Sequence, residues 1–199
     1  MTAFKICGIT RDADAGLAAS LGAAALGFVL WPGSPRHIKL ARVKMIVAGL
    51  PPFVTPVGVF VDPTADEIAK AASAGIRLAQ IHGTMPATSE LPVLRAVHLG
   101  GNEDGLDIEV GPTDTVLLDA HDPVRHGGTG RTVDFERAAA VSARRRIVLA
   151  GGLTQDNVCE AIRRVKPYAV DVASGVEAQP GVKDPAKLRA FAEAVKECV

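Results

Sequence analysis

The chain has 199 residues, and its 22 basic and 22 acidic side chains give no net charge. Hydrophobic residues make up 48% of it, which supplies a sizeable core and excludes an intrinsically disordered protein. The balanced charge disfavours a nucleic-acid binder, because such proteins carry a basic patch. The three cysteines, Cys7, Cys159 and Cys198, are far apart and contain no Cys-x-x-Cys pair. This spacing favours a reducing compartment over a disulfide framework.

Residues 15–35 contain no charged side chain, a stretch as long as a membrane span. Glycines and prolines are spread through it, and a spanning helix tolerates few such breakers. We therefore expect a helix, a turn and a buried strand there. The N-terminal residues lack the apolar run of a signal peptide. The sequence predicts a cytoplasmic protein that does not enter a membrane.

Short apolar runs alternate with amphipathic stretches along the whole chain. Continuous apolar runs are typical of strands buried on both faces, as in a parallel sheet. The expected strands are Phe4–Cys7, Ala25–Leu30, Pro56–Val61, Leu78–Ile81, Val93–His98, Thr115–Leu118, Ile147–Ala150 and Ala169–Val172. The expected helices are Asp12–Leu21, Leu40–Gly49, Ala65–Ala74, Phe135–Ala143, Gln155–Val165 and Pro185–Cys198.

Eight strands alternating with helices fit either a closed eightfold barrel or an open doubly wound sheet. A barrel would have about 25 residues per unit, at the lower size limit of such folds. The segment at residues 98–114 has several glycines and no helical period, so we expect the fifth outer helix to be short or missing. No linker divides the chain, which predicts a single domain over residues 1–199.

Glycine-rich turns follow the last three strands. Gly151 and Gly152 follow the seventh strand, and Ser174 and Gly175 follow the eighth. Backbone amides in such turns can bind an anion, and eightfold barrels commonly hold phosphate after these two strands. The turn with Gly128 and Gly130, after the sixth strand, is a candidate third wall of the phosphate site. The alternative is that these residues only form tight turns.

Cys7 ends the first strand and precedes a glycine. Barrel enzymes place reacting groups at such strand ends, although cysteines are usually inert core residues. An ordinary thiol is ionised to only a few per cent at neutral pH, so a base role needs nearby positive charge. Lys5 and Arg36 are candidate sources of that charge. The residues alone leave a core role and a catalytic role for Cys7 equally open.

Three further side chains are candidates for the mouth of the barrel. Asp119 ends an apolar strand, where partial desolvation favours its acid form, although a carboxylate that caps a helix or anchors a loop is also possible. Arg36 lies on a stiff loop after the second strand and can bind a carboxylate or phosphate, unless it is an ordinary surface arginine. His82 follows the fourth strand and either lines the mouth or is structural. Asp171, within the eighth strand, is expected to be an internal orienting residue.

The histidines lack metal-ligand spacing, and the chain contains no Gly-x-Ser-x-Gly motif. We therefore expect no metal and no cofactor. The candidate site suits acid–base chemistry on a small phosphorylated substrate.

Eight motifs, in order over nearly the whole chain, closely resemble the phosphoribosylanthranilate isomerase family. They are KICGIT (5–10), GFVLWPGSPRHI (27–38), VGVFVD (57–62), QIHG (80–83), LLDA (117–120), GGTGRTVDF (127–135), LAGGLTQDNV (149–158) and VDVASGVEAQPGVKD (170–184). The resemblance implies a (β/α)8 TIM barrel and a cofactor-free Amadori rearrangement in tryptophan biosynthesis. Arg131 stands where the family often has lysine, which keeps the charge.

The resemblance also implies roles for individual residues. Cys7 corresponds to the family's general base, Asp119 to its general acid, and Arg36 to the arginine that faces the anthranilate moiety. The phosphate-binding positions correspond to Gly128, Gly130, Gly151, Gly152, Ser174 and Gly175. His82 is placed on the anthranilate side of the site.

Two alternatives remain beside this interpretation. One is the related aminoaldose isomerase of histidine biosynthesis, or a bifunctional version, which would be expected to use two aspartates and two phosphate sites. The other is a catalytically silent barrel that binds a phosphorylated metabolite. The expected partner is a small phosphorylated molecule, with no nucleic acid and no membrane. A monomer and a homodimer both suit the sequence.

Overall fold

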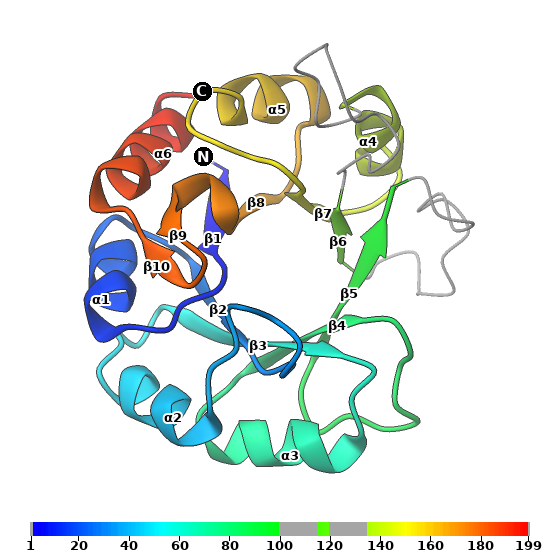
Figure 1. Cartoon of the computed structure of the whole chain (residues 1–199). Helices are drawn as coiled ribbons and strands as arrows, with labels where there is room; N and C mark the ends of the chain where they lie inside the picture. The colour runs from blue at the N-terminus through cyan, green and yellow to red at the C-terminus, as the bar shows by residue number, and fades with distance from the viewer. Residues whose placement is uncertain (1, 100–114, 120–134, 199) are drawn as a thin grey trace.

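A computed structural model of the chain describes residues 2–99, 115–119 and 135–198. Eight parallel strands form a closed barrel in chain order (Figure 1). Because β1 pairs with β8 as well as with β2, the sheet has no open edge, and the open doubly wound alternative is wrong. The strands are β1 (Ala3–Ile6), β2 (Ala25–Val29), β3 (Thr55–Val61), β4 (Leu78–His82), β5 (Val93–His98), β6 (Val116–Asp119), β7 (Ile147–Ala150) and β8 (Ala169–Val172).

Helices surround the barrel on the outside (Figure 1). They are α1 (Asp12–Ser20), α2 (Leu40–Ala48), α3 (Ala65–Ser73), α4 (Phe135–Ser142), α5 (Val158–Val165) and α6 (Pro185–Glu197). The expected helices are confirmed to within a few residues at their ends. None of the described helices is long and apolar enough to cross a membrane.

The connection between β4 and β5 contains no helix, and none of the expected helices falls there. Pro86 and Pro92 flank a short polar segment there, and proline removes the backbone donor that a helix needs. The expectation of a short or missing fifth outer helix falls on residues 100–114, which lie outside the described residues.

Side chains alternate between the two faces of each strand, as the pleat requires. On β1, Phe4 and Ile6 pack outward in the main core against the helices. Lys5 lies between them in sequence and is buried within the barrel. Smaller apolar side chains such as Ala96 and Leu117 fill the barrel's interior. The barrel is therefore a packed core rather than a channel.

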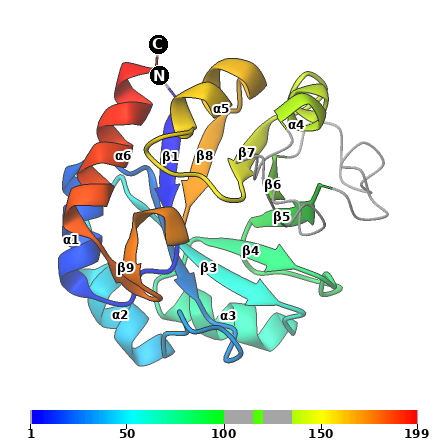
Figure 2. The same cartoon turned by 45° about the horizontal axis from the view of Figure 1, so that its top comes forward.

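A short hairpin of β9 (Glu177–Gln179) and β10 (Val182–Lys183) follows β8 and the 3₁₀ turn Ser174–Val176. It lies beside β1 and α1 in both ribbon views (Figures 1 and 2). Lys183 is fully buried, and its Nζ lies 2.9 Å from Glu177 Oε1. The Lys183 backbone N–H donates to Asp14 Oδ2 of α1 over 3.1 Å. These bonds tie the hairpin to the barrel wall.

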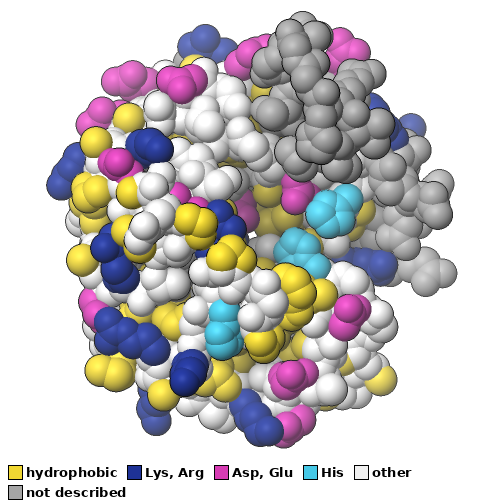
Figure 3. Space-filling model, in the orientation of Figure 1, with side chains coloured by type: hydrophobic (Ala, Val, Ile, Leu, Met, Phe, Trp, Pro, Cys, Tyr) yellow, Lys and Arg dark blue, Asp and Glu magenta, His cyan; other side chains and the backbone are white. Residues whose placement is uncertain are grey.

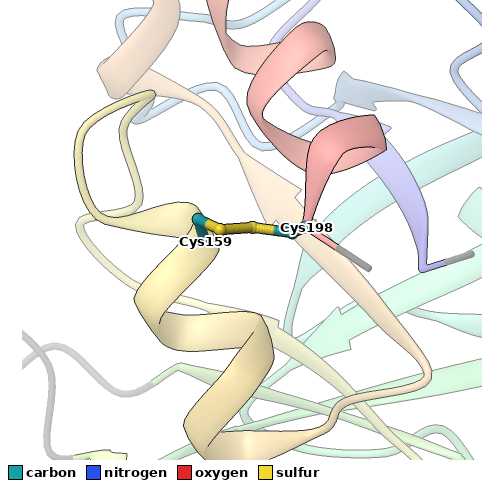
Figure 4. Close-up of a disulfide and its surroundings, with 2 residues drawn as sticks. All are labelled: Cys159 and Cys198. Carbon is teal, nitrogen blue, oxygen red and sulfur yellow. A yellow bond between two sulfur atoms is a disulfide. The ribbon is translucent and has the colours of Figure 1, made fainter.

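Cys159 and Cys198 form a disulfide between the first turn of α5 and the end of α6 (Figure 4). The inference from cysteine spacing that disulfides are disfavoured is wrong for this pair. Their sequence separation is 39 residues, yet α5 and α6 pack against each other, and the two Cα atoms lie 5.3 Å apart. This Cα separation is within the usual range for bridged cysteines. Cys7 is the free cysteine.

Removing the disulfide should destabilise the fold. A cross-link over 39 residues restricts the unfolded chain, so Cys198→Ser should lower the free energy of unfolding by about 2–4 kcal/mol. Urea unfolding with and without a reductant measures this. The reductant should weaken the parent protein and leave Cys198→Ser unchanged. An equal response of both proteins to the reductant would contradict the cross-link.

Replacing Glu177 should cost more than breaking a surface ion pair. Glu177→Gln leaves the Lys183 ammonium buried without a carboxylate, so the free energy of unfolding should fall by about 3 kcal/mol. The control is Asp66→Asn, which breaks the exposed Asp66–Lys70 pair and should cost less than about 1 kcal/mol.

The loss of stability in Glu177→Gln should depend on pH. Burial raises the pKa of Glu177, but hydrogen bonds from Arg36 and Lys183 outweigh it and hold the pKa below the ordinary value of 4.5. A lowered pKa in the folded state gives stability that is present at neutral pH and is lost as the pH falls through that pKa. The difference between the parent and Glu177→Gln should therefore shrink in acid. A constant difference would show that the carboxylate charge is unimportant.

Candidate active site

A cavity of about 840 Å³ opens at the carboxyl ends of the strands. Figure 3 shows a hollow near the centre of this face, with histidine and acidic side chains at its rim. The cavity brings together most of the site residues that the sequence predicts and that the structure describes. The predicted residues that line it are Cys7, Arg36, His82, Asp119, Gly151, Gly152 and Ser174.

Strand register explains why residues so far apart in sequence meet here. Cys7 follows β1, His82 ends β4 and Asp119 ends β6, so all three lie at the same end of the barrel. Each lies two residues after an inward side chain on its own strand, as Cys7 does after Lys5, and side chains two residues apart share a face. The cavity is therefore built from the last inward position of several strands.

Cys7 is nine-tenths buried, and it packs beside Val29 and Val59. Burial raises the pKa of its thiol above the ordinary value, and the positive charge of Lys5 opposes that rise. Gly8 follows with φ +76°, and a side chain there would meet Arg36 Cδ at 2.7 Å. The glycine after Cys7 thus lets the Arg36 side chain cross the strand end.

Arg36 is held by Glu177 rather than exposed as an ordinary surface arginine. Its Nε lies 2.9 and 3.1 Å from the two Glu177 oxygens, and its Nη2 lies 2.6 Å from Oε2. Among the described residues, no hydrogen bond engages Nη1. A bidentate pair fixes the plane of the guanidinium, so Arg36 presents a cation of set orientation to the cavity.

Four polar side chains line the wall from β4 to β6. Gln80 Nε2 lies 2.9 Å from His82 Nε2, so the amide donates and the imidazole nitrogen accepts. Burial lowers the pKa of His82, and His98 lowers it further, which keeps His82 neutral. His98 Nδ1 lies 3.7 Å from Asp119 Oδ2. Asp119 therefore stands at the rim with a histidine beside it.

The loop after β7 supplies backbone groups to the cavity. Gly151 and Gly152 have φ +96° and +65°, a conformation that favours glycine. The Asn157 side chain fixes the loop, because its Nδ2 donates to the Gly152 carbonyl at 2.9 Å and its Oδ1 accepts from Thr154 N–H at 2.8 Å. This role of Asn157 is not predicted from the sequence, because Asn157 falls inside the helix expected at Gln155–Val165, whereas the observed α5 begins at Val158.

Packing alone requires a glycine at position 175, whether or not a ligand binds. A Cβ there would lie 1.9 Å from the Leu153 carbonyl oxygen, so any side chain would separate the loops after β7 and β8. The adjacent Ser174 lines the cavity. Close approach of these two loops gathers the backbone groups that the sequence predicts for phosphate.

The remaining positions include residues predicted for the site that the structure does not describe, and residues near the cavity that were not predicted. Gly128 and Gly130 lie outside the described residues. Among the residues that the structure describes, no group of histidine, cysteine and acidic side chains could hold a metal ion. Two residues of the cavity wall, Gln80 and His98, and two that support Arg36, Glu177 and Lys183, are not predicted from the sequence. The period-two pattern of β4 and β5 was the signal for the first two, since Gln80, His82 and His98 occupy inward positions.

Comparisons with known proteins agree with one another. Residues 4–194 match the family model described as N-(5'-phosphoribosyl)anthranilate isomerase. The enzyme of that name from Chromohalobacter salexigens is 49% identical over 199 residues, which cover 96% of this chain and 92% of that protein. The one from Geobacter sp. strain M21 is 46% identical, with 99% of each chain covered.

Solved structures give the same result. Phosphoribosylanthranilate isomerase from Thermotoga maritima superposes with a TM-score of 0.85 at 37% identity, covering 98% of this chain and 99% of that one. A structure of such an isomerase in complex with reduced 1-(o-carboxyphenylamino)-1-deoxyribulose 5-phosphate has a TM-score of 0.84 at 35% identity, with the same coverage. The sequence match spans nearly the whole chain, and the barrel fold agrees with it. The chain belongs to the N-(5'-phosphoribosyl)anthranilate isomerase family.

Proposed function

We propose that this protein catalyses the Amadori rearrangement of N-(5-phosphoribosyl)anthranilate to 1-(2-carboxyphenylamino)-1-deoxyribulose 5-phosphate in tryptophan biosynthesis. The observation that carries the proposal is one cavity that holds a thiol, a carboxyl group and glycine-rich loops. Cys7 and Asp119 line it on strands separated by β7 and β8, and the glycine loops follow those two strands. In this proposal the base Cys7 and the acid Asp119 lie on either side of the predicted phosphate site.

The proposed reaction begins at the sugar ring. The Asp119 carboxyl group donates its proton to the ribose ring oxygen, the bond from that oxygen to the anomeric carbon breaks, and a protonated Schiff base forms. The Cys7 thiolate then removes the proton from the second sugar carbon. The electron pair of that bond moves toward the Schiff base, which gives an enolamine that tautomerises to the ketone. Each positioned proton transfer contributes about 10² to 10⁴ in rate.

Arg36 and the glycine loops bind the two charged ends of the substrate in this proposal. The guanidinium that Glu177 orients faces the anthranilate carboxylate, with His82 on the same side. The amides around Gly151, Gly152 and Ser174 hold the phosphate, together with the predicted Gly128 and Gly130. Binding of these non-reacting ends orients the sugar between Asp119 and Cys7.

The two alternatives differ from this proposal in one feature each. An isomerase of histidine biosynthesis would be expected to place an aspartate at the end of β1, whereas this chain has Cys7 there. A silent binding barrel would need no acid or base at the mouth, whereas this cavity is lined by a thiol and a carboxyl group that can take those roles. The first feature favours the anthranilate substrate, and the second favours an enzyme over a binding protein.

We also propose a cytoplasmic location, since phosphorylated sugars are charged and do not cross membranes unaided. A monomer and a homodimer both remain compatible with the barrel. One solved structure concerns monomers generated from the dimeric isomerase of Thermotoga maritima, with a TM-score of 0.84 at 35% identity. The oligomeric state of this chain is measured by analytical ultracentrifugation.

Loss of either proton-transfer group should abolish most turnover. Cys7→Ala and Asp119→Asn should each lower kcat by about 10² to 10⁴, because each variant removes one general acid or base. A continuous assay of anthranilate fluorescence measures the rate, and circular dichroism checks folding. Parental kcat in both folded variants would overturn the assignment of acid and base.

Removing the Asn157 side chain, which fixes the loop after β7, should weaken substrate binding more than it slows the chemical step. Asn157→Ala loses two hydrogen bonds to the loop, so KM should rise about fivefold or more while kcat changes less. The inhibition constant for inorganic phosphate should rise in parallel. The matched control is Ser142→Ala, which removes a hydrogen bond to the Lys166 carbonyl at the other ends of α4 and α5. Equal effects of both variants would contradict a phosphate site at this loop.

A further inference from the structure

Lys5 is a buried cation that the proposed reaction does not use. It lies on the same face of the chain as Cys7, two residues earlier, and only 3% of its surface is exposed. It is not part of the cavity lining, whereas Cys7 is. Lys5 therefore lies beneath the floor of the cavity, where it cannot touch a substrate.

The barrel register gives Lys5 one carboxylate partner. Lys5 of β1 pairs with Asp171 of β8 in the parallel ladder, and both side chains point inward. The Nζ lies 2.9 Å from Asp171 Oδ1. An ammonium has three N–H donors, and this bond uses one of them. Asp171 is thus buried and hydrogen-bonded to Lys5.

Gly27 on β2 has no side chain, which leaves room for both the Lys5 ammonium and the Cys7 sulfur. A Cβ at Gly27 would lie 2.8 Å from Cys7 Sγ and 3.1 Å from Lys5 Nζ. Both polar atoms therefore border the space that the missing side chain leaves. A glycine at this inward position of β2 lets the lysine reach the sulfur.

The other cations near Cys7 are engaged elsewhere. Lys183 Nζ binds Glu177 and the Ala173 carbonyl, and Arg36 binds both Glu177 oxygens. His82 is kept neutral by burial, which lowers its pKa. Lys5 is the cation on the cysteine's own strand, and its only charged partner with a hydrogen bond among the described residues is Asp171.

We propose that Lys5 is a positioning residue that makes the buried Cys7 sulfur easier to ionise, through an ammonium shared between that sulfur and Asp171. This inference rests on the proposed function, in which Cys7 is the base. Burial favours the neutral thiol, so a base at this depth needs a cation close to it. Lys5 supplies that cation from below while the cavity above stays open to the substrate.

The electrostatics of the pair agree with this geometry. Burial lowers the pKa of Lys5, but Asp171 and Cys7 outweigh it, and the net pKa lies above the ordinary 10.5. Lys5 is therefore an ammonium at neutral pH. Burial raises the pKa of the Cys7 thiol, Lys5 is the largest influence that lowers it, and Asp171 raises it. The two members of one ion pair thus act on the thiol in opposite directions.

This opposition gives a test that needs no substrate. The rate of Cys7 alkylation by iodoacetamide is measured against pH, and the ultraviolet absorbance of the thiolate gives the same titration without a reagent. Cys159 and Cys198 are bridged, and Cys7→Ala gives the background. The variants are Lys5→Met and Asp171→Asn, with Lys70→Met on the outer surface of α3 as the control.

Lys5→Met should raise the midpoint of the thiol titration by one pH unit or more, so alkylation at pH 7 should slow about tenfold. Asp171→Asn should lower the midpoint, and Lys70→Met should leave it unchanged. A merely structural ion pair would leave the midpoint unmoved or move it the same way in both variants, which would overturn the proposal. If Lys5→Met does not fold, the Asp171→Asn result decides alone. An unchanged or raised thiol midpoint in Asp171→Asn would then contradict the proposal.

Activity measurements separate this proposal from the proposed function. With a thiol that ionises at higher pH, Lys5→Met should lower kcat about tenfold at neutral pH, leave KM within about threefold of the parent, and recover as the pH rises. If the two variants shift the thiol titration in opposite directions but the parent protein has no isomerase activity, the electrostatic role of Lys5 stands and the proposed function is refuted. Isomerase activity without these shifts would refute the role of Lys5 alone.

Discussion

Closure of the barrel between β1 and β8 is the constraint on which the rest of the molecule depends. This pairing sets the register Lys5 to Asp171 and brings the loop after β8 beside the end of β1. It also places the cysteine of the first strand in the same cavity as the carboxyl group of the sixth. Side chains far apart in sequence become neighbours because a closed parallel sheet directs all its carboxyl ends to one mouth.

Two pairs of buried charged groups lie near the cavity, one inside the barrel and one in the hairpin beside it. Lys5 with Asp171, and Lys183 with Glu177, are buried ion pairs, and Glu177 also orients Arg36. Such pairs give little net stability, but removing one partner leaves an expensive buried charge. Their value lies in position: each pair fixes a cation close to the cavity. A neutral chain can therefore contain a local site for an anionic substrate.

Much of this architecture can be predicted from the sequence, and the limits have physical reasons. Apolar runs and helical periods predict the eight strands and six helices because they report burial directly. Cys7, Asp119 and the glycine turns are visible because reacting and anion-binding groups gather at strand ends. Glu177 and Lys183 escape notice because their pairing depends on how a hairpin folds back. The disulfide escapes for a similar reason, since the separation of Cys159 and Cys198 in sequence says nothing of their separation in space.

The central claim is that the cavity isomerises a phosphoribosyl substrate that carries anthranilate. The most direct measurement offers the purified protein phosphoribosylanthranilate and, separately, the aminoaldose substrate of histidine biosynthesis, and follows the conversion of each. The account predicts rapid loss of anthranilate fluorescence with the first substrate and a much lower kcat/KM with the second. Turnover of the histidine-pathway compound alone, or of neither compound by the folded protein, would contradict it.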